Sequence, residues 1–593
     1  MTRTPLRPLA RILDAREKGE NPDVIERENL RRRHDEMRDK ARLRAEGRLL
    51  VLAGLFLCAF LVVGARMAIL AGTDPTEPRA HAPGARIAMA RADIVDRNGR
   101  VLATNLATYA LYAQPPMMVD PIRAATELAS IFPDLKAEKL LEDFTGSRKF
   151  LWIKRKISPE QKQAVHDIGE PGLLFGPREM RLYPNGRLAA HVLGGASFGK
   201  EGVNAAEVIG VAGIERRFDD YLRDPANGDT PLTLSIDLTV QAAVERVLDG
   251  GMRMMNAKGA AAVLMDVNTG EVISMASLPD FDPNNRPRPL TRGDQSDDPL
   301  FNRAVQGVYE LGSVFKIFAA AQAYELGLVD PSTEVETKGP MRWGKFTIRD
   351  FRNYGPRLSV TDVIVKSSNI GTARIAVQIG AERQRDFLGR LGLLEATPVE
   401  LTEAPGAKPL LPKNWSELST MTISYGHGLS SSPLHLAAAY SSLLNGGTRV
   451  RPTLIRAGRV ERGERVVRPE VSEAARDMLR QVVTRGTASF GEVPGYAVGG
   501  KTGTADKPRP QGGYYDSKVI ATFASVFPAN DPKYVLIVTL DEPEETSGTE
   551  PRRTAGWTAV PVAAEIIRRI APLMGLKPEI APLSPTGVTL TSN

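Results

Sequence analysis

The segment 49–71 constrains the architecture of this chain more than any other part of the sequence. Arg66 is its only charged residue, and it is long enough to cross the hydrocarbon core of a bilayer as a helix. Arg66 lies near the end of the segment, where a long side chain can reach the membrane interface. No second segment of this length and hydropathy occurs in the sequence. We therefore predict one membrane-spanning helix.

Charge differs sharply between the two sides of this segment. Basic residues precede it, whereas Asp74 and Glu77 follow it. Because positive charge is retained in the cytoplasm, we expect residues 1–48 to be cytoplasmic and everything beyond Gly72 to be outside. The alternative is a cleaved signal peptide, but its basic region would be far too long and no clear cleavage site is present. The basic residues are Arg31, Arg32, Arg33, Arg38, Lys40, Arg42, Arg44 and Arg48.

Composition places the rest of the chain among ordinary globular proteins. The 593 residues are 42% hydrophobic and 25% charged, which is enough for more than one folded domain. The 77 basic and 70 acidic residues give a net charge of +7 without a basic stripe, so we expect no nucleic-acid partner. The sole cysteine, Cys58, lies in the apolar segment, so the exported part has no disulfide.

Patterns beyond the apolar segment divide the exported part in two. Residues 72–230 mix short strand and helix patterns with turn residues and contain no catalytic cluster. Longer elements follow from 231 to 575. The sequence thus predicts a tail at 1–48, an anchor at 49–71, a non-catalytic domain at 72–230, a larger domain at 231–575 and a C-terminal tail at 576–593.

The larger domain combines strands and helices that are distant in sequence. Hairpin patterns occur near both of its ends, with a helical region between them. This order predicts an α+β domain in which helices cover an antiparallel sheet. The expected strands are 260–266, 271–276, 519–527 and 534–540, and the expected helices are 238–255 and 558–573.

Three short motifs in this domain together carry acyl-transfer chemistry. They supply a nucleophilic hydroxyl, two amines that can act as base or anion anchor, a second hydroxyl and an amide. Such a set is nearly complete for cleaving an amide through a covalent acyl-enzyme. The motifs are Ser313-Val314-Phe315-Lys316, Ser367-Ser368-Asn369 and Lys501-Thr502-Gly503.

Ser313 opens an apolar, alanine-rich segment that ends at Gly327. The pattern predicts a buried helix of about four turns. Because positions i and i+3 share a helix face, we expect the Lys316 amine to approach the Ser313 hydroxyl, and burial favours a neutral lysine that accepts its proton. The free N–H groups at the helix start offer a site for an oxyanion. The alternative is a helix-capping serine with an unrelated lysine.

A second S-x-x-K match runs from Ser197 to Lys200. Serine and lysine are common residues, so about one chance match is expected in a chain of this length. Glycines surround this match, and no helix that holds Ser and Lys one turn apart is expected there. We interpret it as a loop and a coincidence.

Ser367 and Asn369 lie at an expected loop-to-helix junction. The Ser367 hydroxyl suits proton transfer to a leaving amine, and the Asn369 amide suits a substrate amide. As a lone S-x-N, the same residues would be an ordinary helix cap.

The third motif also fits G-x-x-x-x-G-K-T, the phosphate-loop pattern of nucleotide hydrolases, over residues 495–502. A phosphate loop needs a buried strand before it and a helix that begins at the lysine. Pro494 precedes the pattern, and Pro508 and Pro510 follow it, which forbids that helix. We therefore expect a strand over 496–505.

An extended peptide can bind along the edge of such a strand. We expect Gly503 to leave room for a substrate backbone. Lys501, Thr502 and Thr504 then offer a cation and two hydroxyls for a terminal carboxylate.

Together these motifs resemble those of class B penicillin-binding proteins, most closely the division-specific branch. The likeness extends from the apolar segment to about Leu573, with one departure at Leu311, where many relatives have proline. Further matching motifs are Arg91-Ala92-Asp93-Ile94-Val95-Asp96-Arg97-Asn98-Gly99, Ala212-Gly213-Ile214-Glu215, Asn302-Arg303-Ala304, Tyr425-Gly426-His427-Gly428-Leu429-Ser430 and Thr554-Ala555-Gly556-Trp557.

The resemblance implies a penicillin-binding transpeptidase domain on a non-catalytic pedestal. One helix would hold it in the bacterial cytoplasmic (inner) membrane, with the catalytic domain in the periplasm. Ser313 would attack the penultimate D-Ala carbonyl of a stem pentapeptide. Lys316 would act as the base, and Ser367 would pass the proton to the leaving amine.

The resemblance also implies how the substrate is held. Asn369 would bind the donor amide, and Lys501, Thr502 and Thr504 would bind the terminal carboxylate. The backbone N–H groups of Ser313 and Thr504 would form the oxyanion hole. No metal or organic cofactor is required.

The implied partners are peptidoglycan stem peptides, β-lactams that trap Ser313, a membrane-embedded glycosyltransferase of the SEDS type (FtsW-like) and other division proteins. An elongation-specific transpeptidase and a division scaffold with weak activity are the alternatives. A β-lactamase is not favoured, because no Glu-x-x-Leu-Asn occurs between Asn369 and Lys501. A penicillin-sensing receptor would have several spans and a His-Glu-x-x-His motif, and that motif is absent.

Overall fold

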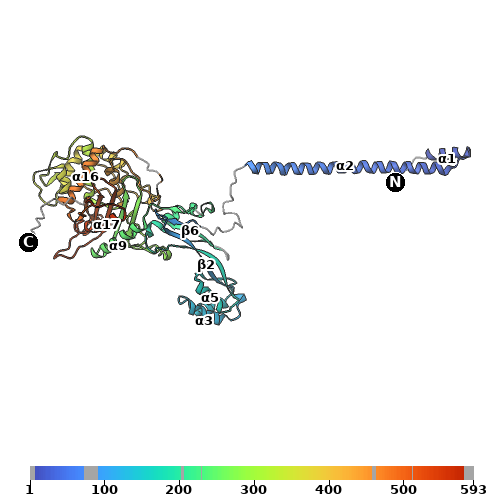
Figure 1. The fold of residues 1–593 in the computed structure, drawn as a ribbon, viewed down its shortest axis with the longest axis horizontal. Helices are drawn as coiled ribbons and strands as arrows, with labels where there is room; N and C mark the ends of the chain where they lie inside the picture. Colours follow the sequence, from blue (N-terminus) through green and yellow to red (C-terminus); the bar gives the residue numbers. More distant parts are fainter. Residues whose placement is uncertain are drawn as a thin grey trace, which may run out of the picture. The chain divides into compact units, whose positions relative to one another are not determined.

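The computed structural model divides the chain into two compact units, residues 1–86 and residues 87–593. Figure 1 shows the helices and strands of both units. Most of the C-terminal tail expected at 576–593 lies outside the described residues. The structure describes residues 7–72, 91–201, 206–228, 230–456, 458, 463–509 and 512–579.

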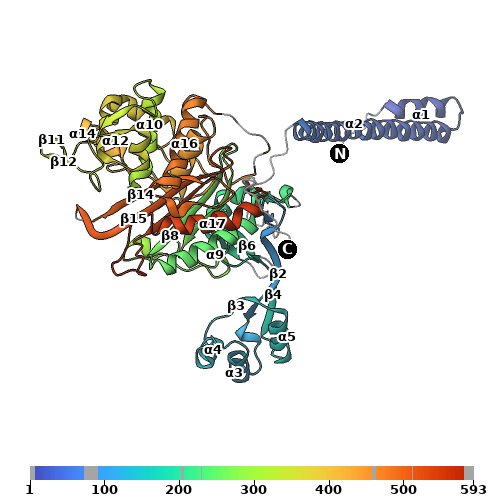
Figure 2. The ribbon, with the colours of Figure 1, turned by 60° about the vertical axis from the view of Figure 1, so that its left-hand side comes forward.

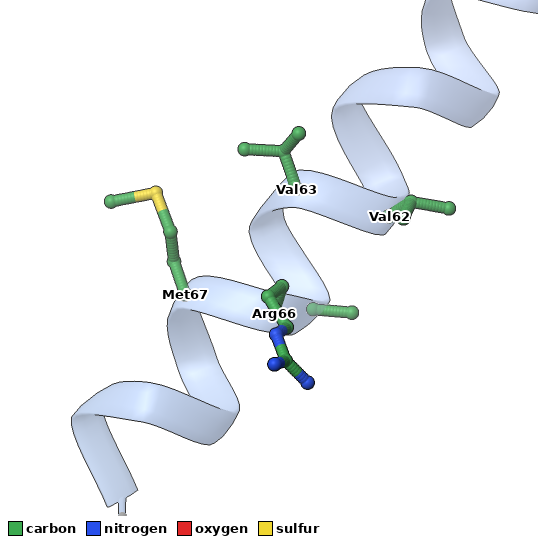
Figure 3. Close-up of a pocket in the computed structure, with 5 residues that line it drawn as sticks. Val62, Val63, Arg66 and Met67 are labelled. Carbon is green, nitrogen blue, oxygen red and sulfur yellow. The ribbon is translucent and has the colours of Figure 1, made fainter. Parts of the chain in front are cut away.

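The first unit consists of helices α1 (Arg7–Glu17) and α2 (Pro22–Gly72). Helix α2 continues without a break through the expected span, and ion pairs one turn apart, such as Arg42–Glu46 at 2.8 Å, support its charged half. Within the described part of the chain, the most apolar stretch of this helix is not buried against any other element. Figure 3 shows Val63 and Met67 extending outward from this helix in a different direction from Arg66. Among the described residues, α2 is the one helix that is long and apolar enough to span a membrane.

The second unit begins with a long β-ribbon. After a tight turn from β1, in which Gly99 has φ +82°, strand β2 pairs first with β1 and then, from Thr104 onward, antiparallel with β4. The Asp96 carboxylate fixes this turn by accepting the backbone N–H groups of Asn98 and Arg100 at 2.9 and 2.8 Å. The strands of this sheet are β1 (Ile94–Val95), β2 (Val101–Ala113), β3 (Leu151–Ile157), β4 (Leu173–Leu182) and β7 (Leu232–Thr233).

A small helical head closes the far end of the ribbon (Figure 2). Its helices have their own hydrophobic core, to which Leu128, Phe144 and Val165 contribute. The capping box of Ser158 and Gln161 starts the last of them. The helices are α3 (Pro121–Ile131), α4 (Ala137–Thr145) and α5 (Pro159–Asp167), after the 3-10 turn η1 (Pro115–Met117).

The root of the ribbon carries a second, two-stranded ribbon of β5 (Gly195–Glu201) and β6 (Ala206–Ala212). Ser197 lies on β5, so the loop predicted for the second S-x-x-K match is wrong. The two glycine-flanked segments pair as strands, and an extended backbone does not bring positions i and i+3 to one face. Helices α6 (Ala190–Leu193), α7 (Gly213–Arg217) and α8 (Asp219–Arg223) and turn η2 (Pro225–Asn227) complete this region.

A buried ionic network holds this root together. The Arg91 guanidinium donates to the carboxylates of Glu215 and Asp219, each at 2.8 Å, and Arg181 donates to Glu215 at 2.7 Å. Glu215 is fully buried, and both arginines are almost so. The motifs that contain Arg91 and Glu215 are far apart in sequence, and these two side chains bring them into contact here.

The catalytic-type domain is built on a five-stranded antiparallel sheet in the order β14-β15-β16-β8-β9. The expected hairpins are confirmed, with β14 beginning three residues later and ending three residues beyond the predicted strand. Nearly every residue of β8 and β9 is buried, because helices cover both faces of the sheet. The strands are β8 (Gly259–Asp266), β9 (Val272–Leu278), β14 (Gly499–Pro508), β15 (Tyr514–Phe527) and β16 (Tyr534–Asp541).

Helices lie in layers on this sheet (Figure 2). Helices α9 (Leu238–Met254) and α17 (Ala559–Leu573) pack together on one face, and both match the predicted helices closely. Helices α15 (Pro433–Leu444) and α16 (Pro469–Arg485) cover the other face. Beyond them pack α10 (Lys316–Glu325), α11 (Val360–Val365), α12 (Asn369–Ile379), α13 (Ala381–Arg390) and α14 (Glu417–Ser424).

Short elements connect these layers. They include two small antiparallel pairs, β10 with β13 and β11 with β12. The bounds are β10 (Glu334–Glu336), β11 (Met341–Trp343), β12 (Phe346–Ile348), β13 (Arg357–Ser359), η3 (Pro283–Asn285), η4 (Gln295–Asp297), η5 (Gly312–Phe315), η6 (Ala404–Gly406) and η7 (Ser489–Gly491).

The buried ionic network leads to a prediction about the stability of the fold. Glu215→Ala leaves the buried Arg181 without a carboxylate, which should lower the free energy of unfolding by about 3–5 kcal/mol. Urea denaturation followed by circular dichroism measures the change. Arg253→Ala is the control, because its pair with Asp249 is exposed and should contribute less than about 0.5 kcal/mol. Equal effects of the two substitutions would contradict the role assigned to the network.

Candidate active site

Ser313 lies on the 3-10 turn η5, which leads directly into α10. The sequence predicts an α-helix from Ser313, and the structure makes its first turn tighter. The Lys316 backbone N–H donates to the Ser313 carbonyl, and residues three apart in a 3-10 turn eclipse one another. Ser313 and Lys316 therefore share one face, and Gly327, at φ +68°, follows the end of the helix as expected.

Three glycines from distant segments allow this turn to be packed tightly. Gly312 has φ +65°, and its N–H donates to the Gly426 carbonyl at 3.2 Å. A Cβ on Gly426 would lie 1.9 Å from the Gly312 oxygen, and one on Gly503 would lie 2.2 Å from the Leu311 oxygen. A side chain at either position would displace the turn that carries Ser313.

The reason for glycine at position 503 thus differs from the predicted one. The sequence suggests a gap for a substrate backbone, but the Cβ direction of Gly503 points at Leu311 and Val314 in η5. This glycine lets strand β14 touch the turn that carries Ser313. The same approach brings the backbone of Thr504 against Gly312, beside Ser313.

The Ser367 hydroxyl lies between two lysines. The Lys316 Nζ lies 3.1 Å from the Ser367 Oγ and 2.5 Å from its carbonyl oxygen, and the Lys501 Nζ lies 2.9 Å from the same Oγ. Both lysine side chains are fully buried. The structure therefore brings one residue from each of the three motifs into direct contact.

Burial changes the acid–base properties of both amines. Desolvation first, and then the neighbouring charge of Lys501, lower the pKa of Lys316 well below its ordinary value, while Asp350 acts in the opposite direction. Desolvation lowers the pKa of Lys501 to about 7. Two buried ammonium groups that share one hydroxyl repel each other, so the pair favours a state with at least one neutral amine. A neutral amine is what a general base requires.

Ser367 has a strained backbone between α11 and α12. Its φ of +62° is unusual for a residue other than glycine and costs on the order of 1 kcal/mol. Asp350 holds the following residues in place by accepting the N–H of Asn369 at 2.6 Å and the Ser368 hydroxyl at 2.7 Å. Asp350, which lies outside the motif, therefore stabilises this strained backbone. The strained backbone directs the Ser367 hydroxyl to the lysines.

Asn369 is the first residue of α12. Its side-chain amide donates to the Arg349 carbonyl at 3.0 Å. The predicted loop-to-helix junction is confirmed, and Ser368 rather than Ser367 caps the helix, by accepting the Gly371 N–H at 3.0 Å. The Ser367 side chain is thus left for the lysines.

Strand β14 presents Lys501, Thr502 and Thr504 at the edge of the sheet. Among the described strands it pairs only with β15, so its other edge has unpaired backbone groups that can bind an extended peptide. The Thr502 hydroxyl contacts the Thr487 hydroxyl at 2.7 Å, and the Thr504 hydroxyl accepts the Ala555 N–H at 3.0 Å. Because 501–508 is strand, the phosphate-loop alternative is excluded.

Sequence reasoning missed two carboxylates that position the site. One is Asp350, which precedes Ser367 by 17 residues and belongs to none of the motifs. The other is Glu310, whose carboxylate accepts the Gly428 N–H at 2.8 Å and the Tyr514 hydroxyl at 3.0 Å. The proximity of Glu310 to Ser313 in sequence was the only available signal.

The Glu310 carboxylate joins three segments around the turn of Ser313. His427 Nδ1 lies 3.2 Å from it, in addition to Gly428 and Tyr514. Burial alone would raise the pKa of Glu310, but these hydrogen bonds outweigh it and lower the pKa. An ionised Glu310 ties the hairpin tip at Tyr514 to the turn before Ser313.

The chain is similar to known proteins in both sequence and structure. The penicillin binding protein transpeptidase domain family matches residues 260–568, and the penicillin-binding protein dimerisation domain family matches residues 86–230. Among the described residues, no group of three or more His, Cys, Asp or Glu side chains is arranged to hold a metal ion.

Curated relatives cover most of the chain. It is 37% identical to the probable peptidoglycan D,D-transpeptidase FtsI of Caulobacter vibrioides, over 82% of each protein. It is 32% identical to the probable peptidoglycan D,D-transpeptidase PenA of Neisseria meningitidis, over 76% of this chain and 80% of that protein. It is 28% identical to the peptidoglycan D,D-transpeptidase FtsI of Escherichia coli, over 83% and 85% respectively.

Solved structures agree with these relatives. Penicillin binding protein 3 of Mycobacterium tuberculosis, complexed with aztreonam, superimposes with a TM-score of 0.62 at 28% identity, over 84% of this chain and 98% of that one. Fold and site together define a penicillin-binding transpeptidase. With its dimerisation and transpeptidase domains, the chain belongs to the class B penicillin-binding proteins.

The depressed pKa of Lys501 predicts a pH-dependent stability. Between about pH 7 and pH 10.5 the unfolded chain binds the lysine proton and the folded chain does not, so stability rises with pH by up to about 1.4 kcal/mol per unit. Lys501→Met removes this term. The variant should be more stable than the wild type near pH 7, and its advantage should shrink toward pH 10.

Urea midpoints at pH 7, 8 and 9 measure this difference. Gln322→Met is the control, because it removes a buried amide that does not titrate, so its effect should be independent of pH. A difference between the wild type and Lys501→Met that stays constant with pH would show that Lys501 folds with an ordinary pKa.

Proposed function

We propose that this chain is a peptidoglycan D,D-transpeptidase that crosslinks stem peptides at the division septum through a serine acyl-enzyme. The observation that carries the proposal is the Ser367 hydroxyl held between two buried lysines beside the turn of Ser313. The relatives named FtsI, in Caulobacter vibrioides and Escherichia coli, support the role in division.

In the proposed acylation, the Ser313 hydroxyl attacks the penultimate D-Ala carbonyl of a stem pentapeptide. Lys316 takes the hydroxyl proton, and its lowered pKa supports this role. The amide C–N bond then breaks, and Ser367 delivers a proton to the departing D-Ala amine, with the two lysines as its proton partners. An amine from a neighbouring stem takes the acyl group and releases Ser313.

The proposed binding groups surround this path. The Asn369 amide binds the donor peptide amide, and Lys501, Thr502 and Thr504 bind the terminal carboxylate. The backbone N–H groups of Ser313 and Thr504 stabilise the oxyanion, and the close contact of η5 with β14 supports this pairing. The free edge of β14 adds main-chain hydrogen bonds to the donor peptide.

The proposed topology places residues 1–48 in the cytoplasm, 49–71 in the inner membrane and the remainder in the periplasm. Residues 72–230 form the pedestal, 231–575 the transpeptidase domain and 576–593 the tail. The basic residues before the span support this orientation. A SEDS-type, FtsW-like glycosyltransferase and other division proteins are the proposed partners in the membrane.

Covalent labelling tests the nucleophile. A fluorescent penicillin should acylate the full-length protein in detergent, because a β-lactam carbonyl takes the place of the D-Ala carbonyl. Ser313→Ala should abolish labelling. Ser197→Ala, on strand β5, should leave it unchanged. In-gel fluorescence after denaturation provides the readout, and labelling that survives Ser313→Ala would refute the assignment.

Cell morphology tests the pathway. Depletion of the protein should block septation while growth continues along the cell, so cells should become filaments. Phase-contrast microscopy with a fluorescent cell-wall label records the outcome. Depletion rescued by the wild-type gene, but not by the gene for Ser313→Ala, would tie the phenotype to catalysis. Rounded cells instead of filaments would assign the protein to elongation.

A further inference from the structure

A cleft of about 410 Å³ opens beside Asn369, outside the groups used in catalysis. Its lining comes from the segment 337–354, together with Ile370 of α12. Asn353 and Tyr354 supply polar groups to its wall, and Pro340 supplies an apolar one. The volume is sufficient for a short peptide branch.

The wall of this cleft is fixed to the catalytic helix. The hairpin of β11 and β12 turns Met341 and Ile348 inward, and both pack against Ile370 in one small hydrophobic cluster. Asp350 lines the cleft and also caps α12 through the N–H groups of Asn369 and Ile370. Cleft and catalytic motif therefore form one rigid arrangement.

This segment is strongly cationic. Asp350 is its only acidic residue, and its carboxylate is already committed to the cap of α12. Five exposed cations occur between positions 338 and 352, and none of them forms an ion pair with any described residue. Two of the five, Arg349 and Arg352, line the cleft. The five are Lys338, Arg342, Lys345, Arg349 and Arg352.

The acidic residues nearest in sequence have other partners. Glu334 pairs with Arg357 at 3.3 Å, and Glu336 pairs with Arg374 at 3.1 Å. The cations at the cleft are therefore available to an external anion. Arginine is suited to a carboxylate, because its planar fork can donate two parallel hydrogen bonds.

We propose that the cleft of Arg349 and Arg352 binds an internal carboxylate of a peptidoglycan stem peptide, separate from the terminal carboxylate assigned to Lys501. The inference rests on the proposed transpeptidase function, which places an acidic peptide in contact with Asn369. The cleft then selects stems with free carboxylates over stems in which these groups are amides.

Competition against penicillin labelling tests this selectivity. The probes are two pentapeptides ending in D-Ala-D-Ala, one with free internal carboxylates and one with the same groups amidated. Each is titrated against acylation of the full-length protein by a fluorescent penicillin. The free-acid peptide should protect Ser313 at about tenfold lower concentration, and added salt should reduce the difference.

Matched variants locate the effect. Arg349→Gln combined with Arg352→Gln should bring the two peptides to within about twofold of each other. Arg357→Gln, an exposed arginine already paired with Glu334, should keep the wild-type difference. Equal protection by both peptides in the wild type, or selectivity that survives the double substitution, would overturn the proposal.

Failure of the transpeptidase function would look different. In that case penicillin would not label the wild-type protein at Ser313, whichever peptide is present. If the double variant loses labelling through misfolding, the wild-type comparison of the two peptides at low and high salt still decides the question.

Discussion

The buried pair of lysines is the interaction on which the site depends. Lys316 and Lys501 come from different elements, one at the start of a helix and one on the edge of the sheet, and they meet at the Ser367 hydroxyl. Placing two amines out of water next to each other is unfavourable when both are charged. The surrounding core enforces the arrangement, and the consequence is that both pKa values are lowered, that of Lys501 to about 7, which favours a neutral amine able to accept a proton.

The core can enforce this only because backbone segments approach very closely. Gly426 and Gly503 let two distant segments touch the turn of Ser313, and a Cβ on either would collide with a carbonyl of that turn. The Tyr440 hydroxyl adds a further contact by donating to the Val314 carbonyl at 2.7 Å from α15. The five-stranded sheet and its two helical layers serve as the rigid support for these contacts.

Polar groups outside the three motifs also hold segments of the chain in place. Asp350 stabilises the strained Ser367 region and also forms part of the cationic cleft, so the cleft and the lysine site share one anchor. Farther away, the network of Arg91, Arg181 and Glu215 fixes the root of the β-ribbon. In each case a charged side chain has its partners on other segments of the chain, which makes the relative placement of those segments specific.

The sequence alone determined the long apolar helix, the hairpins and flanking helices of the larger domain and the three motifs, because hydropathy, periodicity and short-range spacing are local properties. Tertiary structure alone decided that Gly503 serves the turn of Ser313, that Ser367 adopts φ +62°, and that Asp350 and Glu310 hold the site. It also showed that Ser197 lies on a strand. These features arise from contacts between residues far apart in the chain, and such contacts leave no local pattern to read.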